Sequence, residues 1–430
     1  MNIGVISLGC AKNQVDTQTM LGYLKAAGHT FTGEPDKADV LIVNTCGFIT
    51  AAKEESIDAI FEMAQYKEVG RCRLLVVTGC LSERYRKELT EEMPEVELFL
   101  GVREYEKLPA LIAEKLELPC SPILKPERLL VTPPYRAYLR IGDGCNNRCA
   151  YCAIPLIRGD LKSTPAERLV DEAKALADMG VTELSVIAQD TSGYGKDLYG
   201  EPRLIPLLRE LDRIDGLRWV RLLYTYPDTV TPALLDTLAE GERLVPYLDM
   251  PLQHISDPVL KRMNRRGSKA HIESVLNHLA RCGADFTLRT TMMLGFPGET
   301  DANFEELMQF LRDHPFDRVG AFTFSPEEGT VAADMPDQVP EEVKQARLHA
   351  LMLQQQEISR RKNEARIGTT TEVLIEGTDE DGLFGRSPAE APDVDGKIRL
   401  PYRPRIRAGR YLPVRLTAAE EYDMIGEFIE

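Results

Sequence analysis

Residues 143–152 read DGCNNRCAYC and place Cys145, Cys149 and Cys152 at the spacing C-x3-C-x2-C. A structural zinc site needs four protein ligands, commonly two C-x2-C pairs, and no fourth cysteine or histidine is close by in the sequence. Zinc and chance spacing are the simple alternatives. The motif favours an iron–sulfur cluster in which one iron has no protein ligand and is free to bind a small molecule.

The motif follows an apolar stretch that begins a series of six strand-like segments separated by helical patterns. The six segments are RAYLRI (136–141), ELSVIAQ (183–189), RWVRLLYTY (218–226), VPYLDMPL (245–252), FTLRTTMML (286–294) and RVGAFTF (318–324). Six such units in about 200 residues predict a partial or complete β/α barrel. Its active site would lie at the carboxyl ends of the strands, where the three cysteines fall.

Upstream, residues 1 to about 110 repeat one unit three times. Each unit is an apolar run that ends at a cysteine beside a glycine, followed by a helical pattern; the cysteines are Cys10, Cys46 and Cys80. Continuous apolar runs alternating with helices predict an open parallel sheet with helices on its faces, and the cysteines would share its ligand-binding edge. Each cysteine could be a small buried hydrophobe, but the repeated placement favours a second cluster with three thiolate ligands. The other cysteines share no such placement and are interpreted as structural or incidental; they are Cys72, Cys120 and Cys282.

Downstream, the segment from about residue 365 has short, turn-rich strands that predict a small all-β barrel or sandwich. The chain of 430 residues is therefore predicted to be an α/β protein with three domains. These are an open parallel α/β sheet (1–112), a β/α barrel with a long exit helix (133–363) and a small β domain (364–430). The residues from about 112 to 132 look like a connector.

The apolar pattern and the net charge exclude some classes of protein. No apolar run approaches the roughly 18 residues of a membrane span, and the first residues do not resemble a secretory signal. We therefore expect a cytoplasmic protein with reduced thiols and no membrane partner. The net charge of -16, from 52 Lys and Arg against 68 Asp and Glu, disfavours broad nucleic-acid binding and is compatible with a basic partner.

The pattern C-x3-C-x-aromatic-C after the first barrel strand resembles the radical S-adenosylmethionine enzymes. The resemblance implies that the free iron binds S-adenosylmethionine, and that electron donation from the cluster breaks the sulfonium C–S bond to give a 5′-deoxyadenosyl radical. It also implies that Tyr151 flanks the adenine, that Gln189 and Asp190 reach the amino-acid end, and that Gly295 in MLGFPGET lies near the cofactor. The alternatives are packing beside the cluster for Tyr151, a loop and helix cap for Gln189 and Asp190, and an ordinary turn for the glycine motif.

Two three-cysteine sets followed by a β domain similar to the TRAM module resemble the methylthiotransferase family over essentially the whole chain. SLGCAKNQVD, GCNNRCAYCAIPLIRGDL, SVIAQDTSGYG and GRSPAEAPDVDG are most similar to members that methylthiolate the β-carbon of an aspartate in ribosomal protein S twelve. The resemblance implies two [4Fe–4S] clusters, one for sulfur delivery on the N-terminal cysteines and one for radical generation on the barrel cysteines. It also implies two S-adenosylmethionine molecules, an electron donor such as flavodoxin or ferredoxin, and a sulfur donor. No side chain stands out as a general base.

Two rival functions are considered: one has a different substrate, and the other belongs to a different class of protein. A tRNA adenosine methylthiotransferase would use the same chemistry, whereas an iron–sulfur scaffold or electron-transfer protein would not explain the open C-x3-C-x2-C site. Residues 364–430 contain 9 Lys and Arg against 14 Asp and Glu, a net charge of -5, whereas a phosphate-binding module should be basic. The arginine-rich stretch at 399–415 is interpreted as a solvated face. Direct tRNA binding is therefore not expected, and an acidic module suits a basic ribosomal protein.

Overall fold

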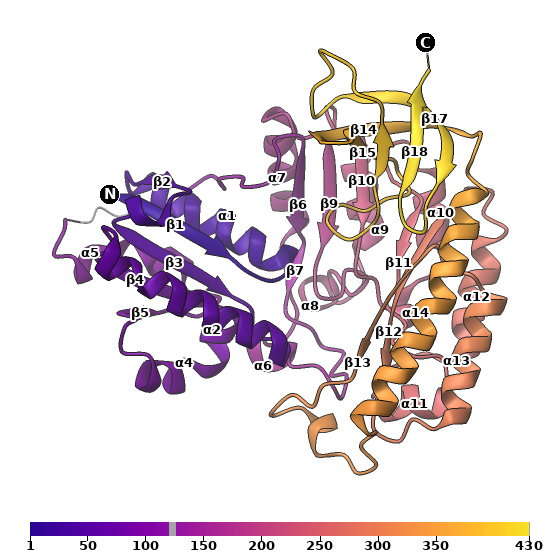
Figure 1. The fold of residues 1–430 in the computed structure, drawn as a ribbon, viewed down its shortest axis with the longest axis horizontal. Helices are drawn as coiled ribbons and strands as arrows, with labels where there is room; N and C mark the ends of the chain where they lie inside the picture. Colours follow the sequence, from indigo (N-terminus) through magenta and orange to yellow (C-terminus); the bar gives the residue numbers. More distant parts are fainter. Residues whose placement is uncertain (120–125, 430) are drawn as a thin grey trace.

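The computed structural model describes residues 1–119 and 126–429. Figure 1 shows three units in chain order: an α/β sheet, a larger unit of strands and helices, and a small β barrel packed on one end of it. Cys120 lies outside the described residues. Within these ranges, every helix is too short or too polar to span a lipid bilayer.

The first unit is a five-stranded, all-parallel sheet in the order β2-β1-β3-β4-β5. Its strands are β1 (Asn2–Ser7), β2 (Thr30–Thr32), β3 (Val40–Thr45), β4 (Leu74–Gly79) and β5 (Leu98–Phe99). Its helices are α1 (Ala11–Ala26), α2 (Thr50–Ala64), α3 (Tyr66–Val69), α4 (Cys80–Glu92) and α5 (Leu108–Lys115), with 3-10 turns η1 (Pro35–Lys37) and η2 (Tyr105–Lys107). Side chains of β3 alternate between two hydrophobic cores, one on each face of the sheet, which explains its continuous apolar sequence.

The three cysteines of this unit lie at the carboxyl edge of its sheet, as predicted. Cys10 immediately precedes α1, Cys46 directly follows β3 and Cys80 is the first residue of α4. Gly79, the last residue of β4, has φ of 98°, and a Cβ added there would lie 2.4 Å from the Thr45 carbonyl oxygen. Only glycine allows so tight a turn into Cys80.

The second unit is a partial β/α barrel, which confirms the predicted fold class. Its sheets β10-β9-β6 and β11-β12-β13 are parallel and are joined by an isolated bridge between Val220 and Leu244. The strands are β6 (Arg136–Arg140), β9 (Glu183–Ile187), β10 (Trp219–Leu222), β11 (Tyr247–Asp249), β12 (Thr287–Leu294) and β13 (Arg318–Thr323), with a short hairpin of β7 (Gly142–Asp143) and β8 (Lys162–Ser163). The helices are α6 (Ile154–Ile157), α7 (Ala166–Asp178), α8 (Lys196–Tyr199), α9 (Leu204–Leu211), α10 (Pro232–Glu240), α11 (Asp257–Arg262), α12 (Lys269–Leu279) and α13 (Asp301–Asp313), with 3-10 turns η3 (Pro227–Thr229) and η4 (Val331–Asp334).

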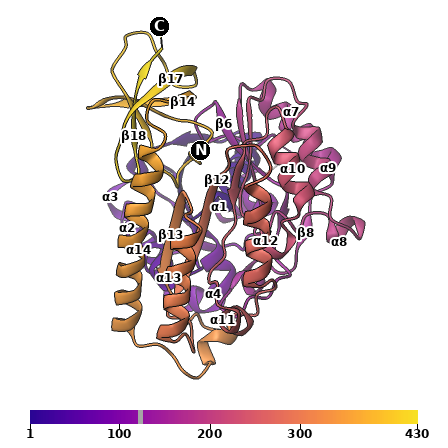
Figure 2. The ribbon, with the colours of Figure 1, turned by 90° about the vertical axis from the view of Figure 1, so that its right-hand side faces the viewer.

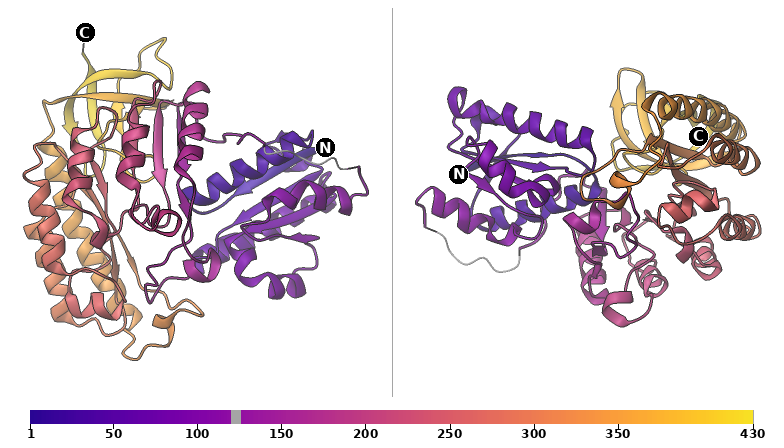
Figure 3. Two further views of the ribbon diagram at one scale, coloured as in Figure 1. Left: turned by 180° about the vertical axis from the view of Figure 1, so that it is seen from behind. Right: turned by 90° about the horizontal axis from the view of Figure 1, so that it is seen from below.

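The barrel is open on one side. Within the described ranges β6 and β13 do not pair with each other, so each is an edge strand. Helix α1 of the first unit packs against β6, and both views of Figure 3 show the N-terminal sheet beside the barrel. The carboxyl edge of the sheet is thereby brought toward the barrel.

The third unit follows a long helix. Helix α14 (Glu341–Glu364) packs on the outside of β13 and leads to the C-terminal strands (Figure 2). These strands form a closed barrel in the order β14-β15-β16-β18-β17, as expected for a small all-β domain. Their bounds are β14 (Thr370–Asp379), β15 (Gly382–Arg386), β16 (Ile398–Leu400), β17 (Tyr411–Ala419) and β18 (Met424–Phe428).

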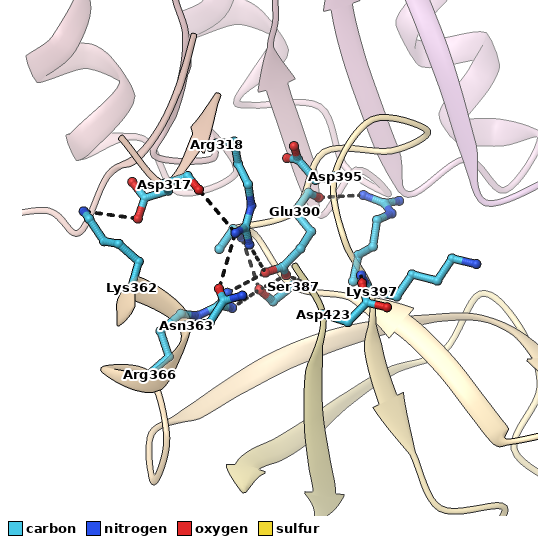
Figure 4. A network of polar contacts seen from close by, with 12 residues as sticks. Asp317, Arg318, Lys362, Asn363, Arg366, Ser387, Glu390, Asp395, Lys397 and Asp423 are labelled. Atoms are coloured by element: carbon cyan, nitrogen blue, oxygen red, sulfur yellow. Dashed lines mark hydrogen bonds and ion pairs between the residues drawn. The ribbon is translucent and has the colours of Figure 1, made fainter. Parts of the chain in front are cut away.

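The loop between β15 and β16 docks the third unit on the barrel (Figure 4). Glu390 in this loop is 1% exposed, and its carboxylate accepts hydrogen bonds from Arg366 (2.6 Å) and the Ser387 hydroxyl (2.6 Å). Arg318, at the start of β13, donates to the same carboxylate (3.3 Å) and to Asn363 at the end of α14 (3.3 Å). A buried carboxylate requires partners of this kind, so the network fixes the loop in place.

Two further carboxylates of this loop reach strands of the barrel. Asp393 accepts a hydrogen bond from the Tyr138 hydroxyl on β6 (2.7 Å), and Asp395 accepts one from the Tyr247 hydroxyl on β11 (2.6 Å). The third unit therefore packs at the amino ends of the barrel strands. The carboxyl ends, where the barrel cysteines lie, are left for the site.

Candidate active site

The cysteines of the sheet form one group of thiols with graded exposure. Cys10 is exposed, Cys46 is half-buried and Cys80 is buried. Burial, with smaller contributions from the neighbouring Cys10 and Cys46, raises the pKa of Cys80 to about 12 against the lowering effect of Arg158. Burial likewise raises the pKa of Cys46, and Cys10 again contributes. These thiols are therefore close enough to repel one another as thiolates, and a bound cationic group would favour their deprotonation.

Asn13 ties together the three turns that carry these cysteines. Its Nδ2 donates to the carbonyl oxygens of Leu8 (3.0 Å) and Thr45 (2.9 Å), which precede Cys10 and Cys46. Its Oδ1 accepts a hydrogen bond from the Cys80 thiol (3.4 Å). One buried amide thus fixes the relative positions of three loops that are far apart in sequence.

The barrel cysteines lie on a loop that wraps tightly after β7. Gly144 has φ of 77°, and a Cβ added there would lie 2.2 Å from the Asp160 carbonyl oxygen. Cys152 N–H donates to the Cys149 carbonyl (3.0 Å), which closes the second half of the motif. Burial raises the pKa of Cys145 to about 11 and that of Cys152 to about 12, with Cys149 contributing to both shifts. This set is therefore also a group of neighbouring thiols.

Arg158 connects the sheet cysteines to the barrel segment that carries the second set. It follows the barrel motif by six residues, is 1% exposed, and donates from Nη2 to the Cys80 sulfur (3.5 Å) and the Asn13 side chain (2.9 Å) of the sheet. The same guanidinium pairs with Asp16 on α1 (2.7 Å) and with Asp143 before the barrel motif (3.1 Å). A buried arginine with partners from both units holds the two sets toward a common junction.

The donor sets fit iron–sulfur clusters better than single metal ions. A single Zn²⁺ with Zn–S bonds of about 2.3 Å needs sulfur atoms only about 4 Å apart. Among the described residues, the only three metal-binding side chains with ligand atoms within 4.8 Å of one another are Asp236 on α10, His278 on α12 and Cys282 just after α12. The cysteine sets are more widely spaced, as a multi-iron cluster requires.

The remaining cysteines have ordinary surroundings. Cys72 is buried, and its thiol donates to the Leu74 carbonyl oxygen (3.4 Å). Cys282 is beside His278 and Asp236, which form a hydrogen bond with each other (2.7 Å). Neither cysteine lies near the two sets.

Tyr151 stands between Cys149 and Cys152 in the sequence, and its side chain contacts Arg265 and Phe296. Its hydroxyl accepts a hydrogen bond from Arg265 (2.9 Å), and its ring meets Phe296 edge-on with centroids 6.4 Å apart. Arg265 also lies 3.8 Å from the Cys149 sulfur and stacks on Tyr226, 4.4 Å from the ring centre. The tyrosine is therefore rigidly placed beside the barrel thiols, and Arg265 adds a cation there.

Gln189 and Asp190 have different surroundings. Gln189 Nε2 donates to Asp143 (2.8 Å), whereas its buried Oε1 has no hydrogen-bond partner among the described residues. Asp190 accepts hydrogen bonds from Asn147 (2.8 Å) and the Ser192 hydroxyl (2.7 Å). Gln189 keeps an acceptor for a ligand, while Asp190 orders the loop that contacts the cysteine motif.

Gly295 of the glycine motif directly follows β12 and has a left-handed backbone conformation. Its φ is 71°, and a Cβ added there would lie 2.2 Å from Lys344 on α14. Its N–H donates to the buried carboxylate of Glu299 (2.8 Å), which also accepts from Arg347 (2.8 Å). The glycine is required by the packing of this turn, whether or not a ligand approaches it.

Sequence reasoning missed the polar residues that join the two sets. Asn13 and Lys12 stand directly after Cys10, and Arg158 stands in the stretch after Cys152, but no spacing rule marks them. Lys12 is also buried: its pKa is lowered to about 8 by burial, partly offset by Cys10 and Asp249. Their only signal is that each of them stands within six residues of a predicted cluster ligand.

Three family models match the chain. They are Uncharacterized protein family UPF0004 at residues 2–101, the Radical SAM superfamily at residues 139–311 and the TRAM domain at residues 367–429. Together the matches span the sheet, most of the barrel and the C-terminal unit.

Curated relatives are similar over nearly the whole chain. The ribosomal protein uS12 methylthiotransferase RimO of Heliobacterium modesticaldum is 47% identical over 100% of this chain and 95% of its own length. The RimO proteins of Geotalea uraniireducens and Acetivibrio thermocellus are 46% and 44% identical, each over 99% of this chain and 98% of their own length.

Two solved structures share the fold. The radical S-adenosylmethionine methyltransferase TsrM of Kitasatospora setae, with cobalamin and a [4Fe–4S] cluster bound, has a TM-score of 0.56 at 14% identity over 75% of this chain and 71% of that chain. The cobalamin-dependent S-adenosylmethionine radical enzyme OxsB has a TM-score of 0.51 at 12% identity over 77% of this chain and 54% of that chain.

Proposed function

Because this chain belongs to the RimO family of ribosomal protein uS12 methylthiotransferases, we propose that it adds a methylthio group to the β-carbon of an aspartate in uS12, ribosomal protein S twelve. The family resemblance of its motifs is confirmed, and the chain is a radical S-adenosylmethionine enzyme with two [4Fe–4S] clusters. When bound, the clusters and S-adenosylmethionine supply the electron, the radical, the methyl group and a site for the sulfur.

The observation that carries the proposal is that Arg158, six residues after the barrel motif, contacts Cys80 of the sheet set. We assign Cys10, Cys46 and Cys80 to the sulfur-delivering cluster, and Cys145, Cys149 and Cys152 to the cluster that cleaves S-adenosylmethionine. Transfer of a methylthio group to a carbon radical requires both sets to serve one substrate position. Arg158 supports this because it contacts Cys80 while pairing with Asp143, which precedes the barrel motif.

Residues of the barrel would orient S-adenosylmethionine. Tyr151, held by Arg265, would flank the adenine, and Gln189 Oε1, which lacks a hydrogen-bond partner among the described residues, would accept a hydrogen bond from the amino-acid end. Gly295 would serve by letting the backbone turn close to the cofactor. No general base is assigned, because hydrogen abstraction by a carbon radical requires none.

The external partners belong to the same proposal. A reductant such as flavodoxin or ferredoxin would supply electrons to the barrel cluster, and a sulfur donor would resupply the sheet cluster. The exposed edge at Cys10 offers a donor access to that cluster. The rival substrate, tRNA, is disfavoured by the net charge of -16 and by the similarity to uS12-modifying relatives over nearly the whole chain.

A reconstitution assay tests the proposal. The chain is reconstituted without oxygen, supplied with dithionite, sulfide and S-adenosylmethionine, and incubated in parallel with uS12 and with unmodified bulk tRNA. Mass spectrometry should find a methylthio group on a uS12 aspartate and no methylthiolated adenosine. Modified adenosine with unmodified uS12 would establish the tRNA rival, and absence of S-adenosylmethionine cleavage would favour the iron–sulfur scaffold.

A further inference from the structure

Lys12 places a buried ammonium group where the sheet meets the barrel, two residues after Cys10. The residue is 7% exposed, and its Nζ lies 2.9 Å from the centre of the Tyr224 ring. Tyr224 belongs to the barrel, so this contact joins the two units. The face of an aromatic ring attracts a cation but is not a counter-ion.

Asp249 is near Lys12 but is already paired. Its Oδ1 accepts a hydrogen bond from Arg289 (3.0 Å), and its Oδ2 accepts one from the Tyr224 N–H (2.9 Å). Tyr224 has φ of 62°, a strained value for a tyrosine, and this hydrogen bond helps to hold its ring under Lys12. Asp249 therefore positions the ring and does not neutralise the lysine.

Asp143, the second carboxylate near Lys12, is also committed elsewhere. It accepts hydrogen bonds from Arg158 (3.1 Å) and Gln189 (2.8 Å). In the part of the chain that the structure describes, no carboxylate oxygen lies within 4.0 Å of Lys12 Nζ. The Cys10 thiol, the other acidic group close to Lys12, belongs to the sheet set. Because a buried ammonium without a paired carboxylate is costly, the site favours an anion from outside the chain.

The junction is open on the sheet side. Gly9 and Cys10 are exposed, although Lys12 and Asn13 behind them are buried. The exposed edge of the sheet is therefore the side from which a substrate would approach Lys12.

We propose that Lys12 binds the β-carboxylate of the substrate aspartate, an inference that rests on the proposed function. That carboxylate is bonded to the carbon that receives the methylthio group, so the ion pair would hold this carbon beside the sheet cysteines. The methionine carboxylate of S-adenosylmethionine is the other anion in the reaction. By the assignment above it belongs to the barrel set, and Lys12 is adjacent to the sheet set.

The test compares the binding of two peptides. One peptide carries the target aspartate of uS12, the other has asparagine there, and both are titrated by fluorescence anisotropy into the full-length, reconstituted enzyme. The wild type should prefer the aspartate peptide. Lys12→Met, which keeps the length and apolar stem, should weaken binding of that peptide by about 30-fold or more and change the asparagine peptide little. Lys25→Met, at an exposed position of the same helix, should behave as the wild type.

Further readouts separate binding from folding. Iron content and formation of 5′-deoxyadenosine should be unchanged in Lys12→Met, and Lys12→Arg should restore the preference for aspartate. If Lys12→Met does not fold, Lys12→Gln takes its place. Equal loss for both peptides, or lost cleavage of S-adenosylmethionine with iron intact, would overturn the inference. A wild type that modifies tRNA and not uS12 would instead overturn the proposed function.

Discussion

At the scale of single residues, the proposed chemistry depends on six thiols and on the few polar side chains that contact them. Asn13 fixes the three turns of the sheet set, and Arg158 links that set to the barrel. Neither contact depends on cysteines of the barrel motif. The two sets should therefore be separable by mutation.

The first prediction concerns iron content. Replacing Cys145, Cys149 and Cys152 together by alanine should leave about half the iron after anaerobic reconstitution, because each set holds its own [4Fe–4S] cluster. Iron and acid-labile sulfide per chain measure this directly. Complete loss of iron, or none, would show that the two sets are not independent sites.

The second prediction separates the roles of the clusters. Replacing Cys10, Cys46 and Cys80 by alanine should spare reductive cleavage of S-adenosylmethionine and abolish methylthiolation. The barrel motif keeps its own contacts, and Arg158 keeps Asp16 and Asp143 as partners. Chromatography of 5′-deoxyadenosine and mass spectrometry of uS12 give the two readouts. Lost cleavage in a folded protein that retains the barrel cluster would refute this division of labour.

At the scale of secondary-structure elements, the β15–β16 loop joins the C-terminal unit to the barrel through buried ion pairs. Glu390 has its pKa held below the usual 4.5 because Arg366 and Arg318 outweigh the effect of burial, which alone would raise it. Such a carboxylate stabilises the fold fully above about pH 4.5. The contribution is lost as the pH falls through the lowered pKa.

The third prediction follows from that ion-pair network. Glu390→Gln should lower the free energy of unfolding by about 3 kcal/mol at pH 7, because it leaves the buried Arg318 and the half-buried Arg366 without their anion. The difference in unfolding free energy between wild type and variant should shrink as the pH falls below 4.5. The wild-type carboxylate also becomes neutral as the pH passes through its lowered pKa. Urea denaturation at pH 7 and at acidic pH measures both values. Exposed Glu342→Gln is the control, and a gap that does not change with pH would contradict the account.

The sequence predicted the long elements and missed the short ones. The three strands that end at cysteines and the six barrel strands were found because each is a continuous apolar run beside a helical pattern. Strands β2 and β5 have only 3 and 2 residues, too few for a periodic pattern. Strand β15, GLFGR, was missed because its two glycines are typical of turns.

For the candidate site too, the sequence predicted some features and missed others. Cysteine spacing located all six candidate ligands, because thiolate motifs are rare and regular. The contacts Asn13–Cys80, Asn13–Arg158 and Lys12–Tyr224 could not be predicted, because each joins residues that are 67 or more positions apart in the sequence. Only the packing of the sheet against the open barrel brings them together.

At the scale of the whole molecule, the C-terminal unit is part of the barrel's structure. Arg386 on β15 pairs with Glu183 on β9 (2.6 Å), and both side chains are buried. Deleting the residues from 365 onward would leave Glu183 and Arg318 buried without these partners. A truncation would therefore disturb the barrel, and the role of charge in substrate binding is better tested by salt.

The fourth prediction concerns that charge. A chain with a net charge of -16 should attract a basic ribosomal protein and repel a phosphate backbone. Binding of uS12, free or in the small subunit, should weaken as salt rises, because surface charges are screened within roughly 8–10 Å at physiological ionic strength. Titrations of uS12 and bulk tRNA at several salt concentrations measure this. Tighter binding to tRNA would contradict the assignment.

The most direct test of the central claim is tandem mass spectrometry of uS12 from cells. Ribosomes are isolated from a host that lacks its own uS12-modifying enzyme and expresses either this chain or its Cys145→Ala variant. The account predicts a methylthio group on the β-carbon of a single uS12 aspartate with the intact chain and unmodified uS12 with the variant. Unmodified uS12 in cells that contain the folded, cluster-loaded chain would contradict it.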